Sequence, residues 1–249
     1  MSGHSKWAGI KHKKAIVDSK RGKIFTKIAR EITVAARFGG GDPEKNVALR
    51  NCILKARVSN MPNDNVQRAI KKGTGNLEGA NYEEVLYEAY APGAVALLVK
   101  ALTDNKNRSA SEIRSVLTKF DSSIASPGAV SYLFKKKGFI ELPLENIPED
   151  DLFLLVTDAG AEDFKRYEDT FEIVTPPDFT FETVKNALEK KNIPILRAEL
   201  TYLPDMTVAV NDKGTASKLL NLRDLLEDLD DVQSVYDNAD IPNTIMAEL

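Results

Sequence analysis

Glycine and proline divide the first 75 residues into three short segments with helical periodicity, which restricts this part of the chain to a small helical bundle. A first helix is predicted over about 20–38, and the three consecutive glycines at 39–41 end it. Asp42 and Pro43 are typical of an N-cap and a first helical residue, which places a second helix from there to about Val58. A Met-Pro pair then precedes a third predicted helix over about 63–72.

Each predicted helix has an apolar face. In the first, Ile24, Phe25, Ile28, Ile32, Ala35 and Ala36 lie on one side, and the opposite side carries Lys20, Lys23, Lys27, Arg30 and Arg37. The second has two apolar strips and should lie between neighbours; the strips are Leu49, Cys52, Ile53 and Ala56 on one side and Val47, Leu54 and Val58 on the other. The third buries Val66, Ala69 and Ile70 and directs outward Arg68, Lys71 and Lys72.

Charge is divided unevenly between this region and the rest of the chain. Residues 1–75 hold seventeen Lys or Arg against five Asp or Glu, whereas the remainder holds seventeen against thirty-two. Such asymmetry indicates a polyanionic partner for the basic part. The alternative is that the basic domain docks on the acidic remainder of the same chain. The two interpretations are compatible with each other. Residues 1–19 are predicted to form a basic arm in which Trp7 either stacks on a base or anchors the arm to the fold.

The acidic part shows a different pattern, with strands alternating with helices. After a linker over 76–82, strands are predicted at 84–91, 94–103 and 129–134 with a helix at 107–120, and a related β-α-β half follows at 206–236. The segment between these halves has its own β-α-β-β-α-β order. We therefore predict an α+β protein with an N-terminal three-helix bundle (1–75) and two ferredoxin-like α+β domains, the third domain (137–204) inserted into the second (82–135 with 205–240).

The sequence offers little that could support catalysis. The two histidines, His4 and His12, lie in the predicted arm, and neither has Cys or carboxylate companions at the spacing of metal ligands. Cys52 falls on an apolar helix face, which favours a buried structural thiol over a nucleophile. We predict that the protein is not an enzyme and needs no cofactor, metal or small-molecule substrate.

One loop, at 103–108, concentrates polar side chains between a predicted strand and a predicted helix. A helix N-terminus with a neighbouring arginine can hold phosphate, so Asn105, Asn107 and Arg108 form a candidate phosphate loop. The alternative is ordinary helix capping by one of the two asparagines.

Several blocks of the chain together resemble the YebC/PmpR family, a bacterial group related to the mitochondrial translational activator of cytochrome c oxidase. They are GHSKWAGIKHKKA (3–15), DSKRGKIFTKIAREI (18–32), GGGDPEKN (39–46), NMPNDNVQRAIKKGTG (60–75) and LTDNKNR (102–108). The resemblance is dense over the first 108 residues. The sequence departs from the family pattern in FDSSIASPGAV and at Ala89 and Ala91, where glycines are familiar.

The resemblance implies a three-domain cytoplasmic protein. Members are described as probable DNA-binding transcriptional regulators, and others look like translation factors that work on the ribosome. Together, the helical pattern and the family's basic positions give a candidate nucleic-acid-binding set: Lys6, Trp7, Lys11, His12, Lys13, Lys14, Lys20, Arg21, Lys23, Lys27, Arg30, Arg37, Arg68, Lys71 and Lys72.

Two kinds of partner fit this basic set. We predict a DNA-binding regulator of gene expression, with rRNA or the ribosome as the alternative target and a protein–protein adaptor acting through the acidic domains as a third hypothesis. No helix carries the Asn, Gln and Arg set that reads bases in the major groove, which favours RNA or weakly specific DNA binding. No apolar run is long enough for a membrane span, and the N-terminus lacks the apolar region of a secretory signal.

Overall fold

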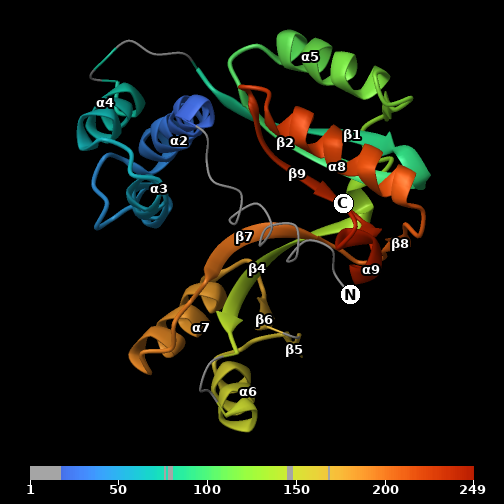
Figure 1. Cartoon of the computed structure of the whole chain (residues 1–249). Helices are drawn as coiled ribbons and strands as arrows, with labels where there is room; N and C mark the ends of the chain where they lie inside the picture. The colour runs from blue at the N-terminus through green and yellow to red at the C-terminus, as the bar shows by residue number, and fades with distance from the viewer. Residues whose placement is uncertain (1–17, 76, 78–80, 145–147, 168) are drawn as a thin grey trace. The chain divides into compact units, whose positions relative to one another are not determined.

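The computed structural model describes residues 18–75, 77, 81–144, 148–167 and 169–249, and for residues 18–21 it describes the backbone only. The chain divides into two compact units, Met1–Ser131 with Thr207–Leu249 (the first unit) and Tyr132–Met206 (the second unit). Within the described ranges, no helix is long and apolar enough to cross a membrane. The predicted fold class is confirmed: the chain is α+β, with an N-terminal helical domain and two α+β domains (Figure 1).

The described N-terminal region is a bundle of three helices, α2 (Asp18–Gly39), α3 (Val47–Val58) and α4 (Asn63–Gly73). Its core is formed by the predicted apolar face of α2, by one strip of α3 and by the inner face of α4. Gly73 ends α4 and lies so close to α2 that a Cβ there would come 2.3 Å from the carbonyl oxygen of Thr33. Gly73 therefore ends α4 and, because it has no side chain, also lets α4 pack closely against α2.

The second helix begins later than predicted. Asp42 and Pro43 lie in a turn, and α3 starts at Val47 with Asn46 as its N-cap, whose side chain accepts from Leu49 N at 3.0 Å. The amide of Asn46 also donates to the carbonyls of Ala35 and Gly40, both at 2.8 Å. This buried asparagine therefore supplies hydrogen bonds both to backbone carbonyls at the end of α2 and to a backbone N–H at the start of α3. For that reason Asn46, and not Asp42, is the N-cap.

Only one of the two apolar strips of α3 is buried. Leu49 and Ala56 are in the core, but Val47, Leu54 and Val58 are exposed. The expectation that α3 lies between two neighbours is therefore not met within the part of the chain that the structure describes.

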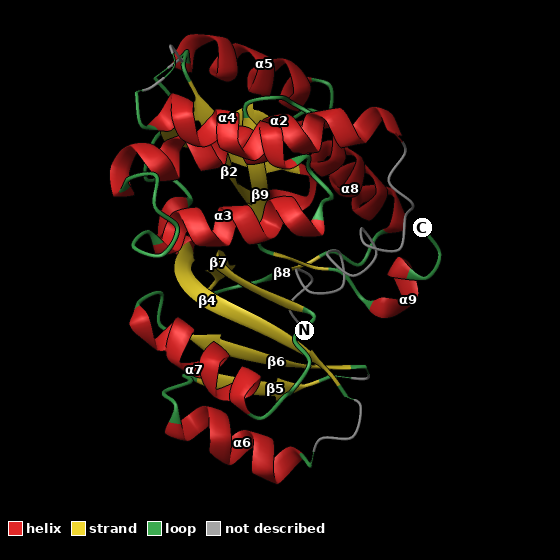
Figure 2. Ribbon diagram, turned by 90° about the vertical axis from the view of Figure 1, so that its left-hand side faces the viewer, coloured by secondary structure: helices red, strands yellow, loops and turns green. Residues whose placement is uncertain are grey.

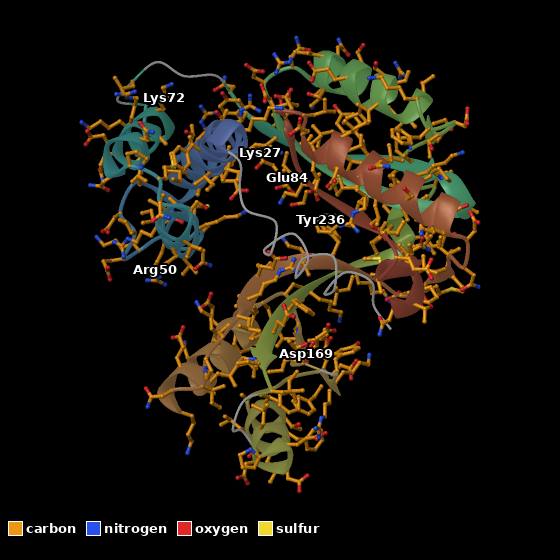
Figure 3. All side chains as sticks on the ribbon, viewed as in Figure 1. Lys27, Arg50, Lys72, Glu84, Asp169 and Tyr236 are labelled. Atoms are coloured by element: carbon orange, nitrogen blue, oxygen red, sulfur yellow. The ribbon has the colours of Figure 1, made fainter. Side chains whose placement is uncertain are left out.

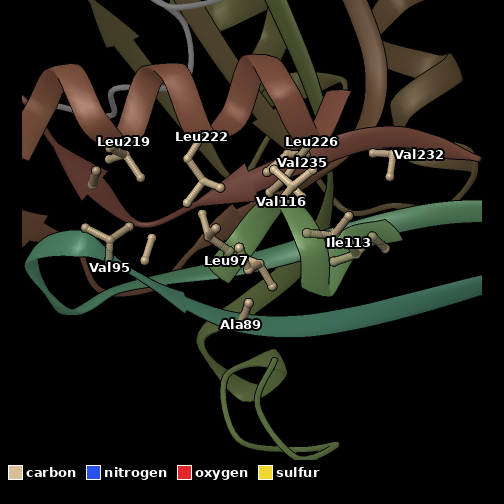
Figure 4. Packing of buried hydrophobic residues seen from close by; sticks show 14 of the residues in the cluster. Ala89, Val95, Leu97, Ile113, Val116, Leu219, Leu222, Leu226, Val232 and Val235 are labelled. Atoms are coloured by element: carbon tan, nitrogen blue, oxygen red, sulfur yellow. The ribbon is translucent and has the colours of Figure 1, made fainter. Parts of the chain in front are cut away.

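The first unit also contains an α+β domain with the sheet order β3-β1-β2-β9. Strand β1 (Glu83–Ala91) pairs with β2 (Val95–Thr103) through η1 (Pro92–Ala94), where Gly93 has a φ of 79°, so a Pro-Gly turn joins the two predicted strands. The helices α5 (Lys106–Thr118) and α8 (Lys213–Glu227) both contribute to the core on the sheet (Figure 4). Strand β9 (Val232–Asp237) lies antiparallel to β2.

The sheet departs from the simple ferredoxin-like plan in one place. The predicted strand at 206–210 is reduced to β8 (Val208–Ala209), which pairs in parallel with β10 (Ala239–Asp240) outside the main sheet. Strand β1 occupies the sheet position between β3 (Ser123–Ile124) and β2 that a ferredoxin-like third strand would take.

The strand predicted at 129–134 is wrong, because a carboxylate distant in the sequence takes up its backbone donors. Residues 127–130 form turns, followed by η2 (Ser131–Leu133). The buried carboxylate of Glu88 accepts hydrogen bonds from the backbone N–H groups of Gly128 (2.6 Å), Val130 (2.7 Å) and Ser131 (2.7 Å). Because these donors are used by a side chain, they are not available for a strand ladder.

The second unit has the predicted β-α-β-β-α-β order: β4 (Phe134–Pro143), α6 (Glu149–Asp158), β5 (Asp163–Arg166), β6 (Thr170–Thr175), α7 (Phe179–Lys190) and β7 (Arg197–Pro204). The sheet order β5-β6-β4-β7 is that of a ferredoxin-like fold. Core residues from α6 and α7 pack on one face of the sheet (Figure 2).

Candidate nucleic-acid interface

Three cations of α2 contact the C-terminal end of α8 and the turn that follows it. Lys23 Nζ lies 2.8 Å from Asp228 Oδ2, and Lys27 Nζ donates to the carbonyl oxygen of Glu227. Arg30 Nη1 donates to Asp231 Oδ1 at 2.7 Å and to the carbonyl of Asp230 at 2.5 Å. We refer to residues 227–231 as the acidic segment. It combines carboxylates with the carbonyl end of a helix dipole, and both attract cations.

The three cations differ in how far they remain accessible. The side chain of Lys23 is 43% exposed, whereas that of Arg30 is 14% exposed against an Asp231 side chain that is 3% exposed. The sequence predicted an open stripe of bases on α2. The structure instead places Lys23 and Arg30 against carboxylates of the same unit and Lys27 against a backbone carbonyl, because the acidic segment complements them in charge.

Asp231 collects donors from three elements. Besides Arg30 it accepts from Arg108 Nη2 (2.8 Å), Ser109 Oγ (2.7 Å) and Thr103 Oγ1 (3.0 Å). Burial alone would raise the pKa of Asp231, but the hydrogen bonds from Ser109, Arg108 and Thr103 together lower it below its ordinary value. The carboxylate therefore stays charged and holds α2, β2 and α5 together.

The structure places the candidate phosphate loop at this same network. Asn105 caps α5, its side chain accepting from Arg108 N at 3.1 Å. Arg108 pairs with Asp104 and Asp231, both at 2.8 Å. Asn107 lies in the first turn of α5 and is exposed. In the described structure Asn105 serves capping and Arg108 the Asp231 network, which accounts for these two side chains without a phosphate.

Among the members of the predicted set whose side chains the structure describes, those of helix α4 are the most exposed. Arg68, Lys71 and Lys72 are all exposed, and Figure 3 shows Lys72 near the end of α4. The polar side of α4 has one acid, Asp64, in its first turn, where the helix dipole favours it. Residues 22–75 hold eleven Lys or Arg against four Asp or Glu, so the described bundle keeps a positive excess.

A pocket of about 300 Å³ lies between α2 and α4. Met61 and Ala69 are among the buried apolar residues that line it, and Phe25 adds an aromatic ring. Arg30, Arg68 and Lys72 supply cations, and Tyr82, just ahead of β1, completes the lining. The guanidinium of Arg30 lies 5.4 Å from the centre of the Tyr82 ring, which is within the range of a cation–π contact.

The remaining members of the predicted set are placed as follows. Arg37 is in the last turn of α2 and is partly buried. The other positions lie outside the residues, or outside the side chains, that the structure describes: Lys6, Trp7, Lys11, His12, Lys13, Lys14, Lys20 and Arg21.

Cys52 is partly buried on the core side of α3. Burial, reinforced by the charge of Glu31, raises the pKa of its thiol to about 11, so the nucleophilic thiolate is scarce at neutral pH. Among the described residues, no three His, Cys, Asp or Glu side chains are grouped so as to hold a metal ion.

Sequence reasoning misses Asp231 and Tyr82, because the pattern assigns the first to a solvated acidic run and the second to a linker. The charge complementarity between 20–37 and 227–231 is a signal that could have pointed to Asp231. No local pattern marks Tyr82, because its neighbours in the pocket come from helices that end earlier in the chain.

Comparison with known proteins identifies relatives along the whole chain. Residues 5–76 match the model of the TACO1/YebC protein N-terminal domain, and residues 82–239 match that of the TACO1/YebC second and third domain. A probable transcriptional regulatory protein of Natranaerobius thermophilus is 54% identical over 249 residues, covering 99% of both chains, and one of Persephonella marina is 52% identical over the full length of both. A crystal structure of a conserved hypothetical protein from Aquifex aeolicus, 50% identical, superposes with a TM-score of 0.84 and covers 96% of this chain and 98% of its own. The chain therefore belongs to the TACO1/YebC family.

Proposed function

We propose that this protein regulates gene expression by binding nucleic acid through the basic helical bundle, and that it does so without catalysing a reaction. The name shared by its relatives, probable transcriptional regulatory protein, supports the regulatory role. DNA is the first target to test, and structured RNA is the second, because both are phosphate polymers that attract the same cations.

The observation that carries the proposal is the exposed basic face of α4. Arg68, Lys71 and Lys72 project from one helix with a single acid near its start, whereas a solvated surface ordinarily mixes both signs. Their guanidinium and ammonium groups are suited to phosphate contacts along a backbone. The bases of α2 are less suited as primary contacts, since Lys23 and Arg30 pair with carboxylates and Lys27 donates to the backbone carbonyl of Glu227.

The test is the salt dependence of binding. Changing Arg68, Lys71 and Lys72 together to Gln should make the negative slope of log K against log salt shallower by about two to three units. Each phosphate that is no longer neutralised reduces the magnitude of that slope by roughly 0.7–0.9. Affinity for duplex DNA and for rRNA fragments should be compared at the same salt concentrations. The polymer that is bound more tightly with the steeper slope is the physiological class.

A matched variant controls for the change in net charge. Lys136, Lys190 and Lys191 are exposed in the second unit, and changing all three to Gln removes the same charge. This control should leave the slope within about one unit of that of the parent protein. If the α4 variant and the control shift the slope equally, the basic face of α4 is only a solvated surface and the proposal is wrong.

A further inference from the structure

We propose that the pocket between α2 and α4 takes up a single unstacked nucleotide of a bound nucleic-acid strand. This inference rests on the proposed function and adds to it a specific site. The pocket is built from described residues of the first unit only.

The dimensions of the pocket fit one nucleotide. Its volume of about 300 Å³ is at the lower end of the range of small-molecule sites, roughly 300–1,000 Å³, so it has room for a base and its sugar but not for a duplex. A double helix presents its bases stacked and paired, so a base enters at the lowest energetic cost from a single strand, a loop or an unpaired end.

The chemistry of the lining matches the parts of a nucleotide. The apolar floor, which includes Ala69 and Met61, and the rings of Phe25 and Tyr82 offer contacts for the flat face of a base. Arg68 and Lys72 are four residues apart on α4, so both lie on one side of that helix and line the pocket. These exposed cations can hold the phosphates on either side of the inserted base.

Arg30 supplies a second, independent reason to expect a ligand. Its Nη1 is committed to Asp231 and the carbonyl of Asp230, but its Nε is buried and has no hydrogen-bond partner among the described residues. A buried donor without an acceptor is destabilising, because it has lost its hydrogen bonds to water and gained none in return. A carbonyl oxygen or ring nitrogen of a base is an acceptor that would satisfy it. Arg30 lines the pocket and is held by Asp231, so its guanidinium is already positioned when the strand arrives.

The experiment separates contacts to bases from contacts to phosphates. Binding of the full-length protein is measured by fluorescence anisotropy to a ten-nucleotide single strand, as DNA and as RNA, and to an abasic strand of the same length and charge. Tyr82→Leu should weaken binding of the base-bearing strands about five- to tenfold and leave the abasic strand within about twofold. Tyr82→Phe, which keeps the ring, should bind like the parent.

A filling variant provides a test that keeps every charge and both rings. Thr26 is exposed and lines the pocket, so Thr26→Leu should reduce the space and weaken only the base-bearing strands. Gln67→Leu, at an exposed position of α4 outside the pocket, is the control and should have no effect. The DNA and RNA arms show which sugar the pocket prefers.

The outcomes distinguish this inference from the proposed function. If Tyr82→Leu and Thr26→Leu weaken the abasic and base-bearing strands equally, or neither at all, while binding keeps its salt dependence, the pocket is not a nucleotide site and the proposed function stands. If the parent protein binds none of these strands, no duplex and no rRNA fragment, both proposals are overturned. Thermal unfolding of each variant should match the parent within a few degrees; a variant that fails this check is replaced by Tyr82→Ile or Thr26→Val and the comparison repeated.

Discussion

Arg30 on α2 and Asp231 ahead of β9 form an ion pair of 2.7 Å, although 201 positions separate them in the chain. The same carboxylate accepts from Arg108, Ser109 and Thr103. Each donor offsets part of the cost of removing the charge of this buried carboxylate from water, so losing any one of them should destabilise it. The pair therefore connects the helical bundle to the α+β domain within the first unit.

Removing Asp231 should be costly. Asp231→Ala leaves Arg30 without its counter-charge in a buried setting, and we expect a loss of roughly 3 kcal/mol in the free energy of unfolding. Urea unfolding followed by circular dichroism measures it. Asp228→Ala is the control, because Asp228 pairs with Lys23 while both side chains are nearly half exposed, and it should cost less than about 1 kcal/mol. Equal losses in the two variants would contradict a special role for Asp231.

The contribution of Asp231 should also depend on pH. Its pKa is lower in the folded state than in the unfolded chain, because the hydrogen bonds from Ser109, Arg108 and Thr103 outweigh the effect of burial. A carboxyl group with a lowered pKa stabilises the fold at pH values above its unfolded pKa of about 3.9, and that stabilisation is lost as the pH falls through the folded value. The gap in urea midpoint between the parent and Asp231→Asn should therefore be constant from pH 7 to 5 and close below about pH 4. A gap that widens on acidification would show that the pKa is raised.

Much of the fold could be predicted because it is encoded locally. The helix stops at glycine, the Pro-Gly turn and the order of elements in the second unit all follow from patterns within a few residues. The start of α3 could not be predicted in this way. Asp42-Pro43 is a good local cap, but Asn46 also reaches back to Ala35, and this tertiary contact decides the boundary.

The missed features share one physical cause, which is separation along the chain. Glu88 reorganises the backbone at 128–131 through a side chain 40 or more positions away, and no periodicity reveals that. The charge excess predicted which part of the chain is basic. It could not separate bases that have acidic partners, such as Arg30, from bases that are open, such as Arg68, because that distinction depends on the position of the acidic segment.

Gly73 should be intolerant of any side chain. A Cβ there would lie 2.3 Å from Thr33 O and 2.7 Å from the Cβ of Ala36, so α4 would have to move away from α2. We expect Gly73→Ala to destabilise the protein by about 1–3 kcal/mol, as overpacking does. Gly22→Ala is the matched control, since nothing lies within 4 Å of its added Cβ and alanine favours a helix interior, so a gain of about 0.5–1 kcal/mol is expected. Thermal unfolding should therefore show a lower melting temperature than the parent for Gly73→Ala and a higher one for Gly22→Ala.

Cys52 should react slowly while the protein is folded. Burial and the charge of Glu31 raise the pKa of the thiol to about 11, so thiolate at pH 8 amounts to only about one part in a thousand. The rate of iodoacetamide labelling, followed by mass spectrometry, should rise about tenfold per pH unit up to pH 10 and be far faster in urea. Glu31→Gln removes one cause of the raised pKa and should speed labelling modestly. Labelling of the folded protein at pH 7.5 as fast as in urea would contradict the burial of this thiol.

The second unit, Tyr132–Met206, should fold when expressed alone. It has its own core, and its first and last strands pair from Phe134 opposite Pro204 to Glu141 opposite Arg197, so both chain ends meet at one place and no outside strand is needed. We expect an α+β circular dichroism spectrum and a cooperative thermal transition from the isolated fragment. A variant with Gly138→Val tests whether that transition reports the native packing, because a Cβ at this position would lie 2.2 Å from Thr175 Oγ1 and 2.5 Å from the ring of Phe181. The variant should lose the cooperative transition or melt well below the parent fragment. An unfolded parent fragment would show that this segment depends on the rest of the chain, and the inserted-domain boundaries predicted from the sequence would then be wrong.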